Sequence, residues 1–271
     1  MSKKAKIITG IITGIVLILL AFGYLCYTGA IKFRKEFKLE EYVPDELIQV
    51  EPSEYVPDLI LVNNEHQIDR DYDADVVFYR DTDVLMNSHI IDHYGEMSDY
   101  IRNNFDDRLY VSSTYRSYED QERVLSEEGE EIAAQPGCSE HQTGLAIDCY
   151  VMYHAGMAFL DTEVGQYVNS HCSEYGFIIR YPKGRKDITG FEFEPWHIRY
   201  VGLPHAEIIA SYDITLEEYL DYLVPGKWYR FGEYVIGCCP EDEIKIPYGL
   251  VGGDVSYSRD NRGNVIVWGI L

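Results

Sequence analysis

The stretch SEHQTGLAID, residues 139–148, places a histidine and an aspartate seven residues apart around a glycine. GLAIDCYVMY, residues 144–153, alternates in character and predicts a β-strand that contains Asp148. An ionised carboxylate in an apolar strand is costly unless it is paired or bound to a metal. His141 lies just before the strand, and Gly144 lets the chain turn between the two. The stretch is therefore either part of a metal site or a capped turn followed by a surface acid.

A second fragment, FEFEPWHIRYV at 191–201, supplies His197. Two histidines and one carboxylate form a common ligand set for catalytic zinc, with a further position left for water. With neutral imidazoles, His141, Asp148 and His197 together carry one negative charge, so a site that holds a divalent ion stays net positive. Such a site polarises a carbonyl and lowers the pKa of bound water to about 7. These three residues are the candidate zinc ligands.

A general base must reach the attacking water, and Glu194 is the candidate. In an unbroken strand Glu194 and His197 would face opposite sides. Pro195 cannot donate to a strand ladder and predicts a local break, which would let Glu194 approach the ligand face. Glu192 is the second candidate, and its simpler interpretation is a solvated loop acid.

A third fragment, SSTYRSYEDQ at 112–121, is expected to leave a strand and open a helix. Arg116 in this fragment would stabilise the oxyanion that forms when water attacks an amide carbonyl, or hold a substrate carboxylate. The alternative is an ordinary surface cation that pairs with one of the many acids.

The middle of the chain, roughly 55–224, reads as mixed α+β. Apolar spacing and turn signals predict strands at 58–63, 108–115, 144–153, 176–182 and 194–202. Helices are expected at 82–106, 117–135, 162–175 and 204–223, with Ser117 and Thr215 as N-caps. Beyond Pro225-Gly226, alternating segments rich in tyrosine, valine and glycine predict a small β-rich region.

Arg116 in YRS, PGCSEHQTGLAID, GFIIRYP and EPWHIRYVG follow one another in an order that closely resembles the VanY-type zinc D-alanyl-D-alanine carboxypeptidases. That family also contains wall L,D-carboxypeptidases and D,D-dipeptidases. The resemblance is strong over about 108–224 and looser over 55–107. It implies an antiparallel sheet with helices packed around it, the zinc DD-peptidase/Hedgehog-like fold. It also implies the following roles: His141, Asp148 and His197 as zinc ligands, Glu194 as base and acid, Arg116 on the carbonyl oxygen, and Ser139 and Gln121 as substrate contacts.

Residues 7–27 contain no charged side chain and are long enough to span a bilayer as a helix. Lysines precede the segment, which favours a cytoplasmic N-terminus, although basic residues also follow it. A cleaved signal peptide ending near Thr28-Gly29-Ala30 is the alternative. We therefore expect the following organisation: a cytoplasmic N-terminus at 1–6, a transmembrane signal-anchor at 7–27, a stalk at 28–55, a zinc carboxypeptidase domain at 56–224 and a β-rich appendage at 225–271.

The formal net charge of −23 argues against a nucleic-acid partner, because phosphates would repel such a surface. The sequence thus predicts a single-pass membrane protein with an extracytoplasmic catalytic domain. It would remove the terminal D-alanine from peptidoglycan stem peptides or lipid-linked precursors, with a glycopeptide-resistance or a housekeeping role. The alternatives are an L,D-carboxypeptidase acting on tetrapeptides, a dipeptidase, and a catalytically silent zinc-fold protein that binds the wall.

Overall fold

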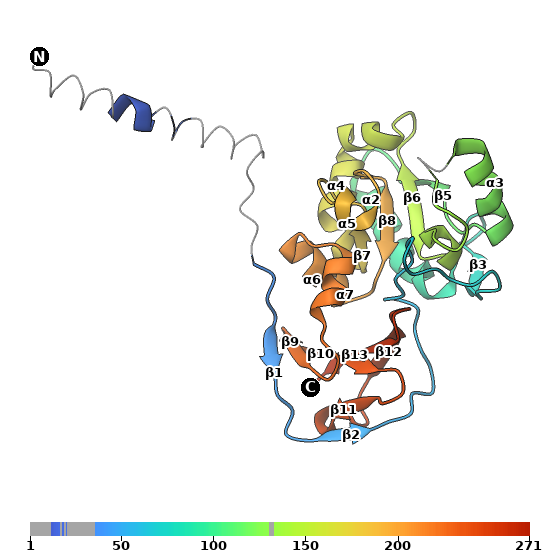
Figure 1. Ribbon diagram of the computed structural model, residues 1–271. Coiled ribbons are helices and arrows are strands. Elements are labelled where there is room, and N and C mark those ends of the chain that lie inside the picture. The colour runs from blue at the N-terminus through green and yellow to red at the C-terminus, as the bar shows by residue number, and fades with distance from the viewer. Residues whose placement is uncertain (1–11, 17, 19, 21–35, 130–132) are drawn as a thin grey trace, which may run out of the picture. The chain divides into compact units, whose positions relative to one another are not determined.

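The computed structural model describes residues 12–16, 18, 20, 36–129 and 133–271 (Figure 1). The chain divides into two units, Met1–Glu36 and Phe37–Leu271, and the second contains every element discussed below. Most of the expected transmembrane segment at 7–27 lies outside the described residues. A search of the described part of the chain finds no helix with the length and apolar character that crossing a bilayer requires.

The sheet that carries the candidate ligands is antiparallel throughout, with the strand order β5-β6-β8-β7 (Figure 1). Its strands are β5 Tyr110–Ser113, β6 Ala146–Tyr150, β7 Phe177–Ile179 and β8 His197–Tyr200. Ile147 and Ile198 lie opposite each other on the central strands and are fully buried. The apolar alternation of these strands therefore places one face in the core and leaves the other for polar side chains.

Helices pack around this sheet, as the mixed α+β expectation required. They are α2 Ile91–Asn104, α3 Tyr118–Glu128, α4 Glu163–His171, α5 Lys186–Thr189, α6 His205–Tyr212 and α7 Leu216–Tyr222. Both predicted N-caps are confirmed: Ser117 Oγ accepts the Asp120 N–H, and Thr215 forms a capping box with Glu218. Short 3₁₀ segments, η1 Ser88–Ile90, η2 Glu140–Thr143, η3 Gly156–Asp161, η4 Cys172–Tyr175 and η5 Tyr248–Leu250, connect the elements.

A second antiparallel sheet, in the order β1-β9-β10-β13-β12, forms the C-terminal region. It comprises β1 Glu40–Tyr42, β9 Trp228–Phe231, β10 Tyr234–Pro240, β12 Val255–Arg259 and β13 Asn264–Ile270. Two smaller pairs are β2 Leu47–Gln49 with β11 Lys245–Pro247, and β3 Val76–Phe78 with β4 Leu85–Asn87. The segment expected to be a stalk, 28–55, thus differs from the expectation from residue 40 onward, because β1 and β2 hydrogen-bond to strands of the C-terminal region.

Residues 58–63, expected to be the first strand of the catalytic domain, do not form a strand. Leu59 and Leu61 are buried, but their N–H groups donate to Ser258 Oγ at 2.9 Å and to the Asp260 carbonyl at 3.2 Å. The same core cluster contains Trp268. The apolar run therefore reflects burial against the C-terminal region, and the catalytic and C-terminal regions share a core.

The helix expected at 82–106 begins only at Ile91. Leu85–Asn87 instead pair with β3, and the Asn87 side chain accepts the His89 N–H at 3.0 Å. This local hydrogen bond gives the backbone an alternative to a longer helix. The periodicity was thus right for the second half of the segment and wrong for the first.

Candidate metal centre

Asp148 and His197 lie directly opposite each other on the neighbouring strands β6 and β8. Asp148 Oδ1 is 2.9 Å from His197 Nδ1. Although it is buried, Asp148 Oδ1 makes no hydrogen bond of acceptable geometry within the described part of the chain. Once Nδ1 carries no proton, both atoms can donate an electron pair to a metal, so one cation could bind between them.

His141 reaches the same point from the 3₁₀ turn η2. Gly144 ends this turn with φ 69°, and a Cβ there would lie 2.8 Å from the Asn87 nitrogen, so the close approach requires glycine. His141 Nδ1 donates to the Thr114 carbonyl at 2.8 Å, which leaves Nε2 free as an acceptor or ligand. Nε2 lies 3.3 Å from Asp148 Oδ2.

Together, His141, Asp148 and His197 offer ligand atoms that all lie within 4.8 Å of one another. Burial lowers the pKa of His141, which favours the neutral imidazole that a metal requires. Burial alone would raise the pKa of Asp148, but the two histidines hold it well below its ordinary value. The donor set therefore fits a zinc ion: two imidazoles, one ionised carboxylate, and a partly exposed carboxylate side.

The pKa of His197 is raised to about 9 in the protein without metal. Burial would lower it, but Asp148 and Glu140 outweigh burial. The same negative surroundings favour a divalent cation, which competes with that proton for Nδ1.

Glu194 reaches the ligand face through the turn that precedes β8. The His197 N–H donates to the Glu194 carbonyl at 3.2 Å, so residues 194–196 form a turn and β8 begins only at His197. Glu194 Oε2 lies 3.8 Å from His197 Nδ1. Burial raises the pKa of Glu194 above its ordinary value, as suits a group that must accept and return a proton. Glu192, by contrast, is an exposed acid 2.8 Å from Lys186 Nζ.

Arg116 adjoins the cluster at Asp148, with Nη2 3.7 Å from Asp148 Oδ2. Its guanidinium donates to Ser113 Oγ at 2.9 and 3.1 Å and to Gln121 Oε1 at 3.1 Å. Gln121 is fully buried and also donates to the Ala134 carbonyl at 2.8 Å. Gln121 therefore supports Arg116, and the buried Ser139 lines the cavity over the ligands.

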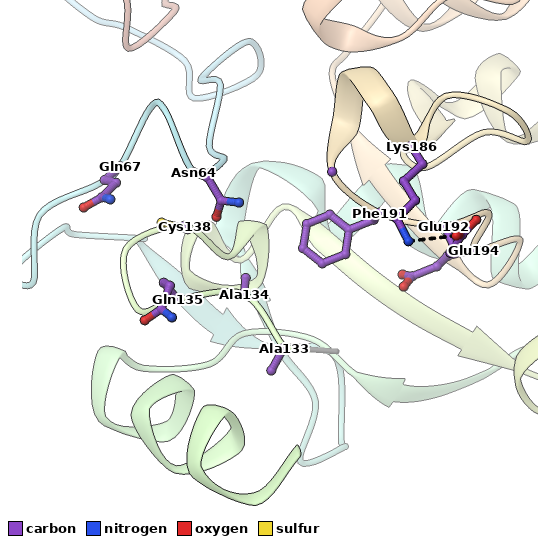
Figure 2. Close-up of a pocket in the computed structure, with 11 residues that line it drawn as sticks. Asn64, Gln67, Ala133, Ala134, Gln135, Cys138, Lys186, Phe191, Glu192 and Glu194 are labelled. Carbon is purple, nitrogen blue, oxygen red and sulfur yellow. Dashed lines mark hydrogen bonds and ion pairs between the residues drawn. The ribbon is translucent and has the colours of Figure 1, made fainter. Parts of the chain in front are cut away.

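That cavity has a volume of about 250 Å³. Its wall includes Arg116, Ser139, Glu194 and the three candidate ligands, together with Tyr181, Phe191 and Trp196. A second cavity of about 470 Å³ adjoins it and shares Ala133, Ala134, Phe191 and Glu194 with it (Figure 2). In Figure 2 the side chains of Asn64, Gln67 and Gln135 lie across this second cavity from Phe191 and Glu194.

The sequence reading missed a buried charge network behind the ligands. Glu140 Oε1 accepts from Arg180 Nε and Arg199 Nη1, each at 2.7 Å, and Arg180 also forms two hydrogen bonds with Glu217. Burial would raise the pKa of Glu140, but the two arginines lower it. Arginines inside the apolar strand segments GFIIRYP and HIRYV were the available signal, because a charge in a buried strand requires a partner just as Asp148 does.

The antiparallel sheet, the three-ligand cluster and the adjoining acid and arginine define a mononuclear zinc hydrolase. A family model described as VanY, D-alanyl-D-alanine carboxypeptidase, matches residues 83–203. The Bacillus subtilis protein named "Putative carboxypeptidase YodJ" is 35% identical over 209 residues, which are 69% of this chain and 77% of that protein. The chain belongs to the VanY family and is a zinc metallopeptidase.

Other similar proteins support the same family assignment. The D-alanyl-D-alanine carboxypeptidase of Enterococcus faecium is 33% identical over 189 residues, which are 64% of this chain and 60% of the relative. A solved VanY structure in complex with Zn(II) is 31% identical, with a TM-score of 0.54 over 60% of this chain and 98% of that one. The L,D-carboxypeptidase LdcB is 37% identical, with a TM-score of 0.54 over 59% of this chain and 84% of that one.

The D,D-dipeptidase VanXYg, solved in complex with a D-Ala-D-Ala phosphinate analogue, has 28% identity and a TM-score of 0.69. The match covers 82% of this chain and 98% of that one, which is more than residues 56–224 alone can supply. The likeness therefore extends into the strands outside the predicted catalytic segment.

Proposed function

We propose that the protein is a D,D-carboxypeptidase that removes the terminal D-alanine from peptidoglycan stem peptides. The observation that carries this proposal is that Glu194 and Arg116 line one cavity with the candidate metal ligands, Glu194 next to His197 and Arg116 next to Asp148. A peptide hydrolase needs these three functions together: a cation site, a proton carrier and a donor for the developing oxyanion.

The candidate zinc ligands are His141, Asp148 and His197. When bound, zinc supplies Lewis acidity that polarises the scissile carbonyl and makes water a better nucleophile. Glu194 takes a proton from the attacking water and returns it to the leaving amino group. Arg116, held in place by Ser113 and Gln121, donates to the carbonyl oxygen as negative charge develops on it.

The adjoining 470 Å³ cavity favours a substrate longer than a dipeptide. Its wall carries three carboxamide side chains, Asn64, Gln67 and Gln135 (Figure 2). Carboxamides both donate and accept hydrogen bonds, so they suit the N–H and C=O groups of an extended peptide. We assign this cavity to the stem-peptide residues that precede the scissile bond.

An L,D-carboxypeptidase acting on tetrapeptide stems is the second candidate, and the 37% identity to LdcB favours it. The wall-binding, catalytically silent alternative is less well supported, because Glu194 and Arg116 both line the cavity and neither is needed to hold a metal. The N-terminal apolar segment would anchor the catalytic domain outside the membrane, close to lipid-linked precursors and the wall. Removal of the terminal D-alanine there would contribute to glycopeptide resistance.

The test is a peptide panel. The purified protein, with and without a chelator, is incubated with a stem pentapeptide ending in D-Ala-D-Ala, the matching tetrapeptide and free D-Ala-D-Ala, and released alanine is measured. We expect metal-dependent release from the pentapeptide above all. Preferred release from the tetrapeptide would instead support the L,D-carboxypeptidase, and preferred cleavage of the dipeptide would reject the role given to the second cavity.

A further inference from the structure

Glu140 lies immediately behind the candidate metal centre and has no role in the chemistry above. Its side chain is fully buried, and the two arginine hydrogen bonds at 2.7 Å both go to one oxygen, Oε1. These two bonds fix the orientation of the carboxylate and leave Oε2 without a hydrogen bond from either arginine.

Oε2 faces the ring of His197. The distance from Glu140 Oε2 to His197 Nε2 is 3.9 Å, and both atoms are buried without a hydrogen-bond partner within the described part of the chain. A buried donor and a buried acceptor that lack partners are each costly, and a hydrogen bond between these two facing atoms would remove both costs.

The two histidines of the centre use opposite ring nitrogens. His141 donates its Nδ1–H to the Thr114 carbonyl and offers Nε2 to the cluster. His197 offers Nδ1, which faces Asp148, and a neutral imidazole that offers Nδ1 carries its proton on Nε2. An acceptor is therefore required behind His197, as Thr114 supplies one behind His141.

We propose that Glu140 is a positioning residue for the metal centre. When a cation binds to Nδ1 of His197, Glu140 Oε2 accepts the Nε2–H of the same ring. The imidazole of His197 then lies closer to Glu140 than the present 3.9 Å. Arg180 and Arg199 hold the carboxylate in the required orientation. Carboxylates behind metal-bound histidines fix the tautomer and the ring orientation, and their loss typically weakens metal binding 10–100-fold. This inference rests on the metal site of the proposed function.

Glu217 provides a matched control. It is also a largely buried partner of Arg180, with two hydrogen bonds at 2.6 and 2.9 Å, but it belongs to α7 and its bonds go to the side of the guanidinium away from Glu140. Glu140→Gln and Glu217→Gln each remove one carboxylate charge from the same network and keep the side-chain shape. Both should lower the midpoint of urea unfolding of the metal-free protein.

Zinc affinity separates the two variants. In competition with a chromophoric chelator at pH 7, we expect Glu140→Gln to weaken zinc binding about 10–100-fold and Glu217→Gln to change it less than about threefold. Equal affinities for the two variants would overturn the proposal. This readout is independent of peptide cleavage. A protein whose zinc affinity depends on Glu140 but which hydrolyses none of the peptides would reject the proposed function alone.

A measurement on the unsubstituted protein covers the case in which Glu140→Gln fails to fold. Long-range ¹H–¹⁵N correlation of the zinc-loaded protein reports the tautomer of each histidine. We expect His197 to carry a slowly exchanging proton on Nε2. A proton on Nδ1, or an Nε2 proton that exchanges at the rate of an exposed imidazole, would reject the assignment of Glu140.

Discussion

Glu194 Oε2 lies 3.8 Å from Nδ1 of His197, although the two residues would face opposite sides of a regular strand. Pro195 and Trp196 form a turn instead of continuing the strand, which begins only at His197. The side chains of Glu194 and His197 therefore line the same cavity. The acid is therefore close to the candidate metal without being required as a ligand, because Asp148 and the two histidines already complete a three-ligand set.

Substituting Glu194 should abolish turnover while the metal stays bound. We expect Glu194→Ala to lower kcat by about 10²–10⁴-fold, because a positioned general base contributes on that order. Zinc content, measured by atomic emission after dialysis, should match that of the unsubstituted protein. Glu122→Ala is the control, since Glu122 is an exposed acid on α3 that lines neither cavity. Peptide cleavage near the parent rate in Glu194→Ala would reject the base assignment.

Removing a proposed ligand should affect both metal content and rate. We expect His197→Ala to lower bound zinc as well as peptide cleavage, because only two proposed ligands would remain. Chelation of the unsubstituted protein should abolish cleavage, and added Zn²⁺ should restore it. Full zinc occupancy in His197→Ala would remove His197 from the ligand set.

Arg116 should act on the transition state rather than on the metal. Loss of one donor to a developing oxyanion costs about 10²–10³ in kcat, so we expect a drop of that size in Arg116→Ala with unchanged zinc content. Arg123→Ala is the control, because the ion pair that Arg123 forms within the described part of the chain is with Asp120, three residues earlier on α3. A variant with raised KM and unchanged kcat would show that Arg116 holds the substrate carboxylate instead.

Asp148 shows how far sequence reasoning reaches at this site. A carboxylate in an apolar strand signalled an unusual partner, and the structure places it between His141 and His197. The same logic applied to Arg180 and Arg199 would have indicated the buried network, but nothing local says that Glu140 is the acid that meets them. Pairing between residues 40 apart or more depends on tertiary contacts that no local pattern encodes.

In the C-terminal region, the sequence predicts the strands but not their pairing. Alternation predicted a small β-rich region beyond Pro225-Gly226, and the structure contains β9, β10 and β13 there. The pairing of β9 with β1 was not predictable locally, because β1 is only three residues long and lies far earlier in the chain. The same holds for β2, which is also three residues long and pairs with β11. A strand of three residues has too few alternating positions to produce a recognisable sequence pattern.

His205 connects the α-helical and β-rich parts of the core. It is fully buried at the start of α6, with Nδ1 2.7 Å from Tyr219 Oη and its ring 4.4 Å from that of Trp268 in an edge-on arrangement. Burial lowers the pKa of His205 to about 3. The folded protein therefore keeps this histidine neutral at pH values where an unfolded chain would protonate it.

Protonation of the unfolded chain should make the fold acid-sensitive through His205. A histidine whose pKa is depressed on folding stabilises the fold above the unfolded pKa of about 6.5, and this stability declines as pH falls toward the folded pKa. Between pH 6.5 and 5 the loss is about 2 kcal/mol. Urea unfolding of the chelated protein at several pH values should show a smaller decline in His205→Gln, whereas substitution of the exposed His154 should leave the decline unchanged. Equal slopes in His205→Gln and the unsubstituted protein would show that His205 is not the group responsible.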